Sequence, residues 1–520
     1  MVGEAIPMAT LILNGAPVEA DDALTLLEAL RDLPGLRAAK DGCSPQGQCG
    51  CCTVLVDGEP RVACVTPVRR IDGRAVTTLE GLDDAQAFEW ADAFVAAGAS
   101  QCGFCTPGIV VRLEALRRRG TLGDPAAVDR ALAAHLCRCT GWRTIHEAAE
   151  QVAGGSVADT SGTRDLDAAS RRATLEGHTP QRVSPDVVLG AAGFADDTVP
   201  EGALVAVPGP DGEWVVAERL HEARAVAGKV QGRRTTVPAT PPLSAPEGDW
   251  ALTLRTSWVE PAYLEVDVAW CAPAGEPASV LANGGAFGAK LDSPLPAAAR
   301  ELAERHGRTV VARWSREDTV RLGPKRPPIA AGVRADGSGF VRVARTSGIA
   351  AAIGSVAPGL EVEEVDLVGP PTSADVRGAG WVEAAVLLAA VRGDTVVTSP
   401  DGATATATIG DGTVSVAVRC GEVLDETVLR SYCIGAAHMA IGWVTSEAIA
   451  VGDDGTVSDL TIRSFGIIRS SDMPQVEVVV EPDDGPARNA SDAVLGSVAA
   501  AVWAAQGHPP TWPTGIGFAP

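Results

Sequence analysis

The chain has 520 residues, of which 46% are hydrophobic and 21% charged, proportions typical of a globular protein with three or four domains. The net charge of −23, from 43 Lys and Arg against 66 Asp and Glu, disfavours a nucleic-acid partner because an acidic surface repels phosphates. No run of 18 apolar residues indicates a membrane span, and the start MVGEAIPMATLILNG lacks a basic n-region and a twin-Arg motif, so we expect a cytoplasmic protein.

The first elements predicted along the chain are a hairpin and a helix. Residues 10–20, TLILNGAPVEA, have the strand–Asn-Gly–strand pattern that is typical of a two-residue hairpin turn. Residues 25–33, TLLEALRDL, have the apolar spacing of a helix that packs on one face of that hairpin.

Nine of the twelve cysteines lie in the first 139 residues. A disulfide framework suits small secreted domains, so paired cysteines here indicate metal ligands. The first set has the spacing C-x5-C-x2-C-x11-C, one residue longer at its start than the plant-type [2Fe-2S] pattern. Its predicted ligands are Cys43, Cys49, Cys52 and Cys64. Cys51 is surplus, because using it would shorten the second spacing to one residue. A zinc ribbon is the alternative, but it would normally have two CxxC knuckles.

A second set of cysteines has the spacing C-x2-C-x31-C-x1-C, and two cysteines one residue apart are unusual for zinc. Its predicted ligands are Cys102, Cys105, Cys137 and Cys139. The intervening sequence predicts one helix over 108–120 and another that begins with Asp124 as N-cap and Pro125 in its first turn. This metal site should therefore lie at the tips of a small helical bundle.

Two motifs within this second set, QCGFCTPG (101–108) and LCRCTGW (136–142), carry a family resemblance. Residues 8–153 resemble the iron–sulfur subunit of the molybdenum hydroxylases, the xanthine dehydrogenase/aldehyde oxidase/carbon monoxide dehydrogenase family. The resemblance implies a β-grasp [2Fe-2S] ferredoxin domain over 8–80 and a four-helix [2Fe-2S] domain over 81–153. It also implies that Gln101 approaches a molybdopterin, although Gln101 is also compatible with an ordinary polar loop position.

The rest of the chain resembles, more weakly, the molybdenum-binding large subunit of the same family. Composition predicts a linker over 154–166 and a second boundary in the Pro-rich stretch 236–249. The resemblance implies an α/β-hammerhead-like domain over 167–235 and a shortened mixed α/β molybdopterin-binding-like domain over 250–520. The expected fold class is therefore α+β and multidomain.

Sequence blocks within 250–520 keep the family order. ANGGAFGAK (282–290) resembles the glycine loop that approaches the molybdenum ligands and pterin, and DVRGAGWVE (375–383) resembles a segment whose Arg faces the substrate. The resemblance implies the cofactor-binding residues Gly284, Gly285, Phe287, Gly288 and Arg377. Glycines also mark plain turns, and an Arg there also suits a surface ion pair, so both alternatives stay open.

This region also departs from the family pattern. It is less than half as long as the family's large subunit, and it lacks a second set of pterin-binding loops. The family's general base is the Glu of a GVGE motif, whereas GPARNASDAVLG (485–496) offers Asp492 as the nearest acid. Asp492 is thus the candidate catalytic base, with a helix N-cap as the alternative role. Glu260 is another carboxylate in a family-like block, but as part of a Glu-Pro pair it is expected to be structural.

The sequence thus predicts an oxidoreductase component of a molybdenum hydroxylase. Two [2Fe-2S] clusters would relay electrons from a molybdopterin site, which oxidises a small substrate, to FAD on a partner chain. The alternative is an electron-transfer and scaffold subunit that binds no molybdenum and docks on a separate full-length molybdopterin chain. A redox sensor or assembly factor is a third possibility. Three further cysteines are expected to be buried and unpaired, namely Cys271, Cys420 and Cys433.

Overall fold

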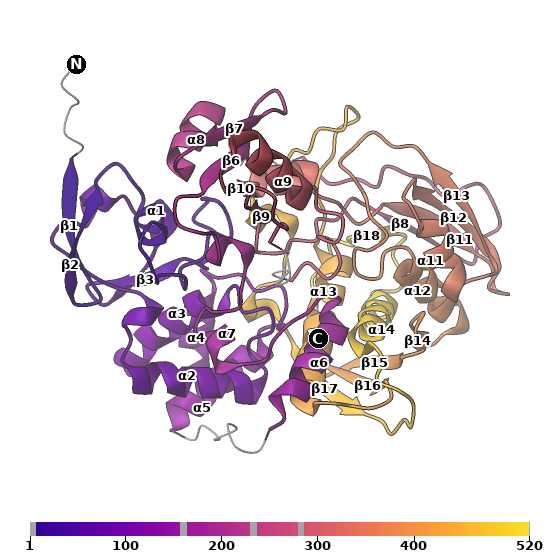
Figure 1. Cartoon of the computed structure of the whole chain (residues 1–520). Helices are drawn as coiled ribbons and strands as arrows, with labels where there is room; N and C mark the ends of the chain where they lie inside the picture. The colour runs from indigo at the N-terminus through magenta and orange to yellow at the C-terminus, as the bar shows by residue number, and fades with distance from the viewer. Residues whose placement is uncertain (1–6, 156–163, 229–236, 279–284, 519–520) are drawn as a thin grey trace.

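A computed structural model describes residues 7–155, 164–228, 237–278 and 285–518, and Figure 1 shows the chain from its N-terminal sheet to its C-terminal helices. The first unit is a five-stranded sheet of order β2-β1-β5-β3-β4 with one helix beside it. Asn14 and Gly15 both have positive φ, as the predicted Asn-Gly hairpin turn requires. Thr25 and Glu28 form a capping box at the helix start. The elements are β1 (Met8–Leu13), β2 (Ala16–Asp21), α1 (Leu26–Arg31), β3 (Thr53–Val56), β4 (Glu59–Val62) and β5 (Ala75–Thr77).

The second unit is the predicted bundle of four helices. Asp124 caps the third helix and Pro125 begins it, as the sequence predicts. The second and fourth helices each begin just after one of the cysteine pairs. The helices are α2 (Asp84–Ala97), α3 (Thr106–Arg118), α4 (Pro125–Leu132) and α5 (Arg143–Gly154). Most of the predicted linker 154–166 lies outside the described residues.

The third unit differs from the predicted domain 167–235. Its four-stranded sheet has the order β7-β6-β10-β9, so two of its strands come from beyond the predicted boundary. The cause is burial: β6 is largely buried, and the fully buried strand β10 pairs with it in parallel through Val310–Ala312. The elements are β6 (Leu204–Pro208), β7 (Trp214–Ala217), α8 (Leu220–Ala227), β9 (Val268–Cys271), α9 (Leu295–His306) and β10 (Val310–Arg313).

Two helices at the start of the predicted 167–235 domain also belong elsewhere. They are α6 (Leu166–Gly177) and α7 (Pro185–Val188). Helix α6 packs on the C-terminal helix α13, and α7 packs on α2 of the four-helix bundle. The segment after the linker therefore joins the cluster-bearing half of the chain to its C-terminal half.

The C-terminal unit contains two sheets, of order β13-β12-β11-β8-β18 and β14-β15-β16-β17. The strands are β8 (Leu252–Thr256), β11 (Ile329–Val333), β12 (Gly339–Ala344), β13 (Leu360–Val365), β14 (Val397–Thr398), β15 (Thr404–Gly410), β16 (Thr413–Arg419), β17 (Gln475–Val480) and β18 (Thr511–Trp512). The helices are α10 (Arg316–Leu322), α11 (Ile349–Val356), α12 (Trp381–Arg392), α13 (Glu426–Thr445) and α14 (Ala490–Ala505).

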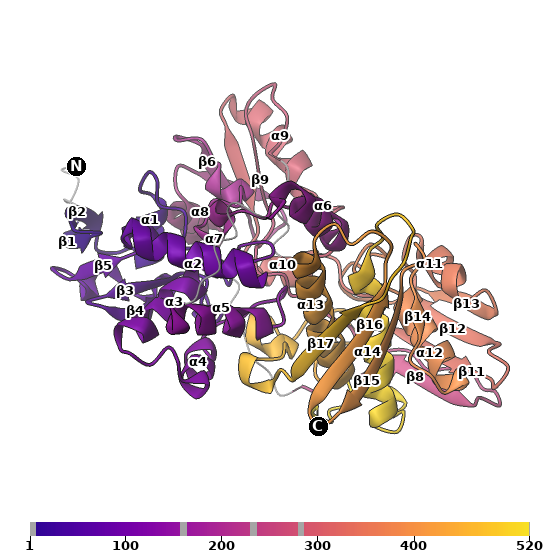
Figure 2. The same cartoon turned by 90° about the horizontal axis from the view of Figure 1, so that it is seen from below.

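Helices α13 and α14 form the buried centre of this unit. Both are buried over most of their length and rich in small apolar residues, a pattern typical of buried helices. Figure 2 shows them beside the β15–β17 sheet, with α13 between that sheet and the N-terminal half. No described helix is both long and apolar enough to cross a membrane.

Candidate functional site

The first predicted set of cysteines comes together in the structure. All four side chains are buried, and the sulfur of Cys43 contacts those of Cys49 and Cys64, while Cys64 also contacts Cys52. Contact with Cys49 holds the pKa of the Cys43 thiol well below its usual range. Contact with Cys43 raises the pKa values of Cys49 and Cys64. Without a cation, the thiols of Cys49 and Cys64 therefore keep their protons and stabilise the thiolate of Cys43. A bound cation would let all four sulfurs ionise.

Backbone amides also point at this group. The N–H groups of Gln46 and Gln48 donate to Cys43 Sγ at 3.3 and 3.5 Å, and the N–H of Cys64 donates to Cys52 Sγ at 3.4 Å. Donors of this kind stabilise sulfur that carries negative charge.

The second predicted set forms two contacting pairs at the ends of helices. Cys139 Sγ and Cys102 Sγ are 3.5 Å apart, and Cys137 contacts Cys105. Contact with Cys105, helped by a hydrogen bond with Thr140, lowers the pKa of Cys137 to about 6. Because α3 and α5 both begin at this group, the positive ends of their dipoles also favour thiolates.

The two groups of cysteines adjoin each other. The N–H of Leu136, next to Cys137, donates to the carbonyl of Cys49 at 3.0 Å. A Cβ at Gly50 would lie 2.5 Å from Nδ1 of His135, and one at Gly108 would lie 2.5 Å from the Gly50 carbonyl. Glycine at these positions lets the loop of the first group touch the helical bundle of the second.

The predicted cofactor residues gather beside the second group, except Gly284, which lies outside the described residues. A Cβ at Gly285 would lie 2.9 Å from Cys139 Sγ, and one at Gly288 would lie 1.9 Å from the Asp375 carbonyl. Phe287 packs under the Arg377 guanidinium, 4.4 Å from ring centre to Cζ. These contacts are with the protein's own backbone and side chains.

Gln101 lies at the same place. Its Nε2 donates to the Cys139 carbonyl at 3.1 Å and to Ser431 Oγ at 3.0 Å, so it connects the second group to α13. Its Oε1 is buried and has no hydrogen-bond partner among the described residues.

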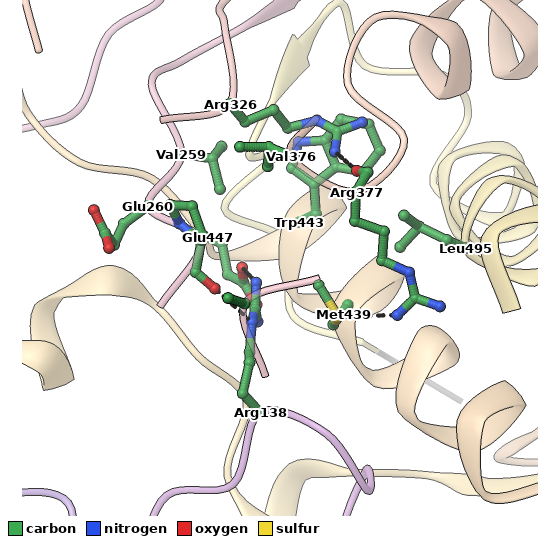
Figure 3. Close-up of a pocket in the computed structure, with 12 residues that line it drawn as sticks. Arg138, Val259, Glu260, Arg326, Val376, Arg377, Met439, Trp443, Glu447 and Leu495 are labelled. Carbon is green, nitrogen blue, oxygen red and sulfur yellow. Dashed lines mark hydrogen bonds and ion pairs between the residues drawn. The ribbon is translucent and has the colours of Figure 1, made fainter. Parts of the chain in front are cut away.

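A small cavity next to these residues is lined by Arg138, Arg326 and Arg377 (Figure 3). Each of these arginines already has an acidic partner. Its free volume is about 30 Å³, room for about one water molecule. The buried ion pairs, with their shortest N–O distances, are Arg138–Glu447 (2.6 Å), Arg326–Glu383 (2.7 Å) and Arg377–Asp492 (2.7 Å).

Asp492, the predicted base, lies in the first turn of α14. The helix is capped by Asn489, which accepts the Asp492 N–H at 3.0 Å, so the alternative N-cap role for Asp492 is wrong. Burial alone would raise the pKa of the Asp492 carboxyl. Its oxygens, however, lie 2.9 Å from His178 Nε2 and 2.7 Å from Arg377 Nε, and these two neighbours hold the pKa well below its usual range. A carboxylate in that state is a weak base. Its catalytic role remains a prediction.

Two expectations about other residues can be compared with the structure. Glu260 is buried and paired with Lys325 at 2.8 Å, consistent with a structural role. The three scattered cysteines are buried, as expected. Sequence reasoning missed the acidic partners Glu383 and Glu447 and the contact of Asp492 with His178, because no spacing pattern connects such distant residues.

The cysteine groups fit [2Fe-2S] clusters, because each offers four buried sulfurs and nearby stabilising dipoles. The small cavity lined by Arg138, Arg326 and Arg377, called the central cavity below, does not fit a pterin cofactor within the described residues. The free space accommodates about one water, and the three arginines are already bound to carboxylates.

The fold and the cysteine groups together define an iron–sulfur protein, and comparisons with known proteins agree. Residues 78–150 match the [2Fe-2S] binding domain family. The chain is 39% identical to the nicotinate dehydrogenase small FeS subunit of Eubacterium barkeri, over 24% of this chain and 78% of that protein. It is 35% identical to the isoquinoline 1-oxidoreductase subunit alpha of Brevundimonas diminuta, over 28% of this chain and 100% of that protein.

A longer relative and two solved structures extend the comparison. The xanthine dehydrogenase of Emericella nidulans is 41% identical over 26% of this chain, which spans only 11% of that enzyme. The aldehyde oxidoreductases of Desulfovibrio desulfuricans and Desulfovibrio gigas share the fold over 95% of this chain and 97% of each of theirs, with TM-scores of 0.68 and 0.67 at 15% identity. The chain belongs to the molybdenum hydroxylase family of oxidoreductases, and its predicted multidomain fold is confirmed.

Proposed function

We propose that this chain relays electrons through two [2Fe-2S] clusters within a molybdenum hydroxylase. Each cluster, when bound, takes up and releases one electron at a time. The proposed ligands of the first are Cys43, Cys49, Cys52 and Cys64. The proposed ligands of the second are Cys102, Cys105, Cys137 and Cys139.

The observation that carries this proposal is the contact between the two buried cysteine groups. The Leu136 N–H bonds to the Cys49 carbonyl, so a ligand of one group and a neighbour of a ligand of the other are joined by a single hydrogen bond. The loop and the bundle pack closely at Gly50 and Gly108, where an added Cβ would lie 2.5 Å from a neighbouring atom. A closely packed junction favours electron transfer, because little around it has to reorganise.

We propose that electrons enter from a molybdopterin site on a partner chain and leave to an FAD-binding partner. A separate molybdopterin chain is supported by the one-water cavity and its neutralised arginines. Separate subunits are also supported by the relatives that are named small subunits, among them the nicotine 6-hydroxylase small subunit of Paenarthrobacter nicotinovorans.

A second candidate is a chain that holds its own molybdopterin. Two observations favour it: the free Gln101 Oε1 offers an acceptor beside the second group, and Gly285 comes close to Cys139. In that case Phe287, Gly288 and Arg377 would hold the cofactor, and Asp492 would have to leave its ion pairs to act as a base.

Electron paramagnetic resonance of the dithionite-reduced chain tests the relay. The proposal expects two distinguishable [2Fe-2S] signals that integrate to two spins per chain. A single signal with one spin would show that one of the cysteine groups binds no cluster and would refute the relay.

A further inference from the structure

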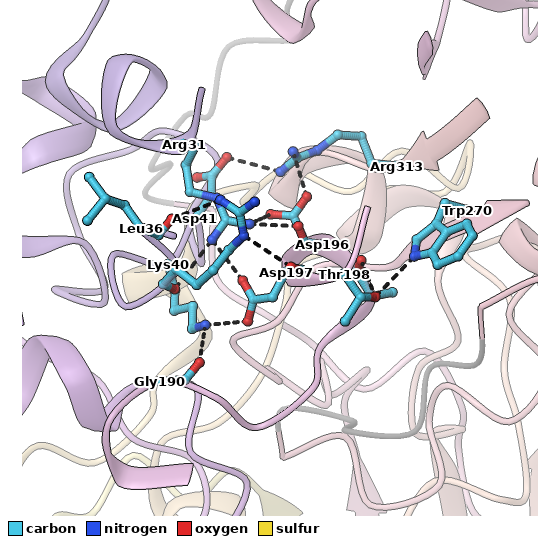
Figure 4. Close-up of polar contacts among 12 residues, drawn as sticks. Arg31, Leu36, Lys40, Asp41, Gly190, Asp196, Asp197, Thr198, Trp270 and Arg313 are labelled. Carbon is cyan, nitrogen blue, oxygen red and sulfur yellow. Dashed lines mark hydrogen bonds and ion pairs between the residues drawn. The ribbon is translucent and has the colours of Figure 1, made fainter. Parts of the chain in front are cut away.

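The surroundings of the two cysteine groups differ in charge. Near the loop that leads into the first group, four cations are each within ion-pair distance of a carboxylate. Figure 4 shows Arg31, Lys40 and Arg313 among the aspartates. Lys40 pairs with Asp197, and Arg313 pairs with Asp41 at 3.3 Å. The other two cations, Arg31 and Arg224, pair with the same cluster of aspartates.

Arg316, at the start of α10, is an exception. Its side chain is fully buried, and its Nη2 donates to the carbonyls of Gly42 at 2.8 Å and Leu264 at 2.7 Å. Its Nη1 has no hydrogen-bond partner, and no carboxylate of the described residues is within ion-pair distance of it. Gly42 directly precedes Cys43, and a Cβ there would lie 3.1 Å from Cys49 Sγ. A buried cation without a counter-charge is costly, so its position next to these sulfurs requires explanation.

Arg463, in the short 3-10 turn Ile462–Phe465, is a second exception. Its Nε donates to the Gln48 carbonyl at 2.9 Å, and its Nη2 donates to the Ala133 carbonyl at 2.9 Å. Within the described residues it has only carbonyl and amide partners, and its charge interacts with the sulfurs of Cys49 and Cys43.

The second group has the opposite arrangement. Arg138 lies between two of its ligands, but both of its terminal nitrogens bond to Glu447, at 2.6 and 2.8 Å. Arg377, beyond Phe287, is neutralised by Asp492. Arg138 and Arg377 near the second group are thus compensated, whereas Arg316 and Arg463 near the first have no carboxylate partner among the described residues.

We propose that Arg316 and Arg463 of the C-terminal region raise the reduction potential of the first cluster above that of the second. This inference rests on the proposed function. A [2Fe-2S] cluster becomes more negative when it accepts an electron, so an uncompensated cation beside it stabilises the reduced form. The first cluster is then the electron sink of the pair, and electrons move from the second to the first. The C-terminal region acts as an electrostatic cap that sets the direction of flow.

A redox titration of the purified full chain, followed by electron paramagnetic resonance of both clusters, tests this assignment. Arg463→Gln removes one cation at a half-buried site. We expect the equilibrium constant for electron transfer from the second cluster to the first to fall about tenfold, which is about 59 mV for one electron. Arg316→Met should also lower this equilibrium constant. Arg469→Gln is the matched control, because Arg469 is exposed on the same segment and interacts with Arg463.

Each outcome decides a different point. An unchanged potential gap in Arg463→Gln, or an equal shift in Arg469→Gln, overturns the assignment. If Arg316→Met fails to assemble clusters, Arg463→Gln alone decides. Absence of one of the two signals in the unaltered chain refutes the relay itself, whereas two signals with an unmoved gap refute only the role of these arginines.

Discussion

The pair between Arg138 and Glu447 should hold the helical cluster domain on the C-terminal region. Arg138 is 4% exposed and Glu447 1% exposed, and two hydrogen bonds of 2.6 and 2.8 Å join them. Glu447→Gln keeps the shape and one acceptor oxygen but removes the negative charge. Breaking a buried pair on one side costs about 3–5 kcal/mol, because a buried charge is left without its partner. Since one hydrogen bond is kept, we expect a loss of about 3 kcal/mol in the free energy of unfolding.

Guanidinium chloride denaturation, followed by the visible absorption of the clusters, measures this loss. For a denaturant slope of a few kcal/mol per M, the midpoint should fall by about 0.5–1 M. Glu481→Gln is the matched control, because Glu481 pairs with Arg419 at a similar 2.6 Å, but the side chains are 39% and 62% exposed. An exposed pair of this kind contributes less than about 1 kcal/mol. Equal midpoints for Glu447→Gln and the unaltered chain would show that the buried pair does not hold the domains together.

Cys139→Ser should remove one of the two electron paramagnetic resonance signals and leave the other; loss of neither would mean that the ligand assignment is wrong. Cys51→Ala should leave both signals and the iron content unchanged, since Cys52 is the assigned ligand, and loss of the first signal would transfer that role to Cys51. His178 has a pKa raised by Asp492, so the stability it adds is present below about pH 6.5 and is lost as the pH rises through the raised pKa. Thermal unfolding of His178→Gln should therefore be less dependent on pH between about 6 and 8 than that of the unaltered chain, and parallel pH profiles would contradict this.

The local elements of the N-terminal half could be predicted because their determinants are close in sequence. The Asn14-Gly15 turn, the Asp124-Pro125 helix start and the short spacings within each cysteine set all act over a few residues. The contact between the two cysteine groups could be predicted only in part. The sequence offers Gly50 and Gly108, but nothing in the spacing shows that one touches His135 and the other touches the first loop.

The C-terminal half was predicted less well because its determinants are distant in sequence. The sheet that contains β6 extends beyond the predicted boundary at 235, because β10, about 100 residues later, supplies the buried partner of β6. The family order offered Arg377 and Asp492 as separate candidates, and only the fold shows that they pair with each other and that His178 contacts Asp492. The partner of Arg138 is 309 residues away, and only the fold brings it close.

We propose that this chain carries two [2Fe-2S] clusters and no molybdenum of its own. The most direct test is to express the chain alone in a host that makes molybdopterin, purify it without oxygen, and count iron, acid-labile sulfide and molybdenum per chain. We expect about four irons, about four sulfides and no molybdenum. About one molybdenum per chain would contradict it and would show that the central cavity opens to hold the cofactor.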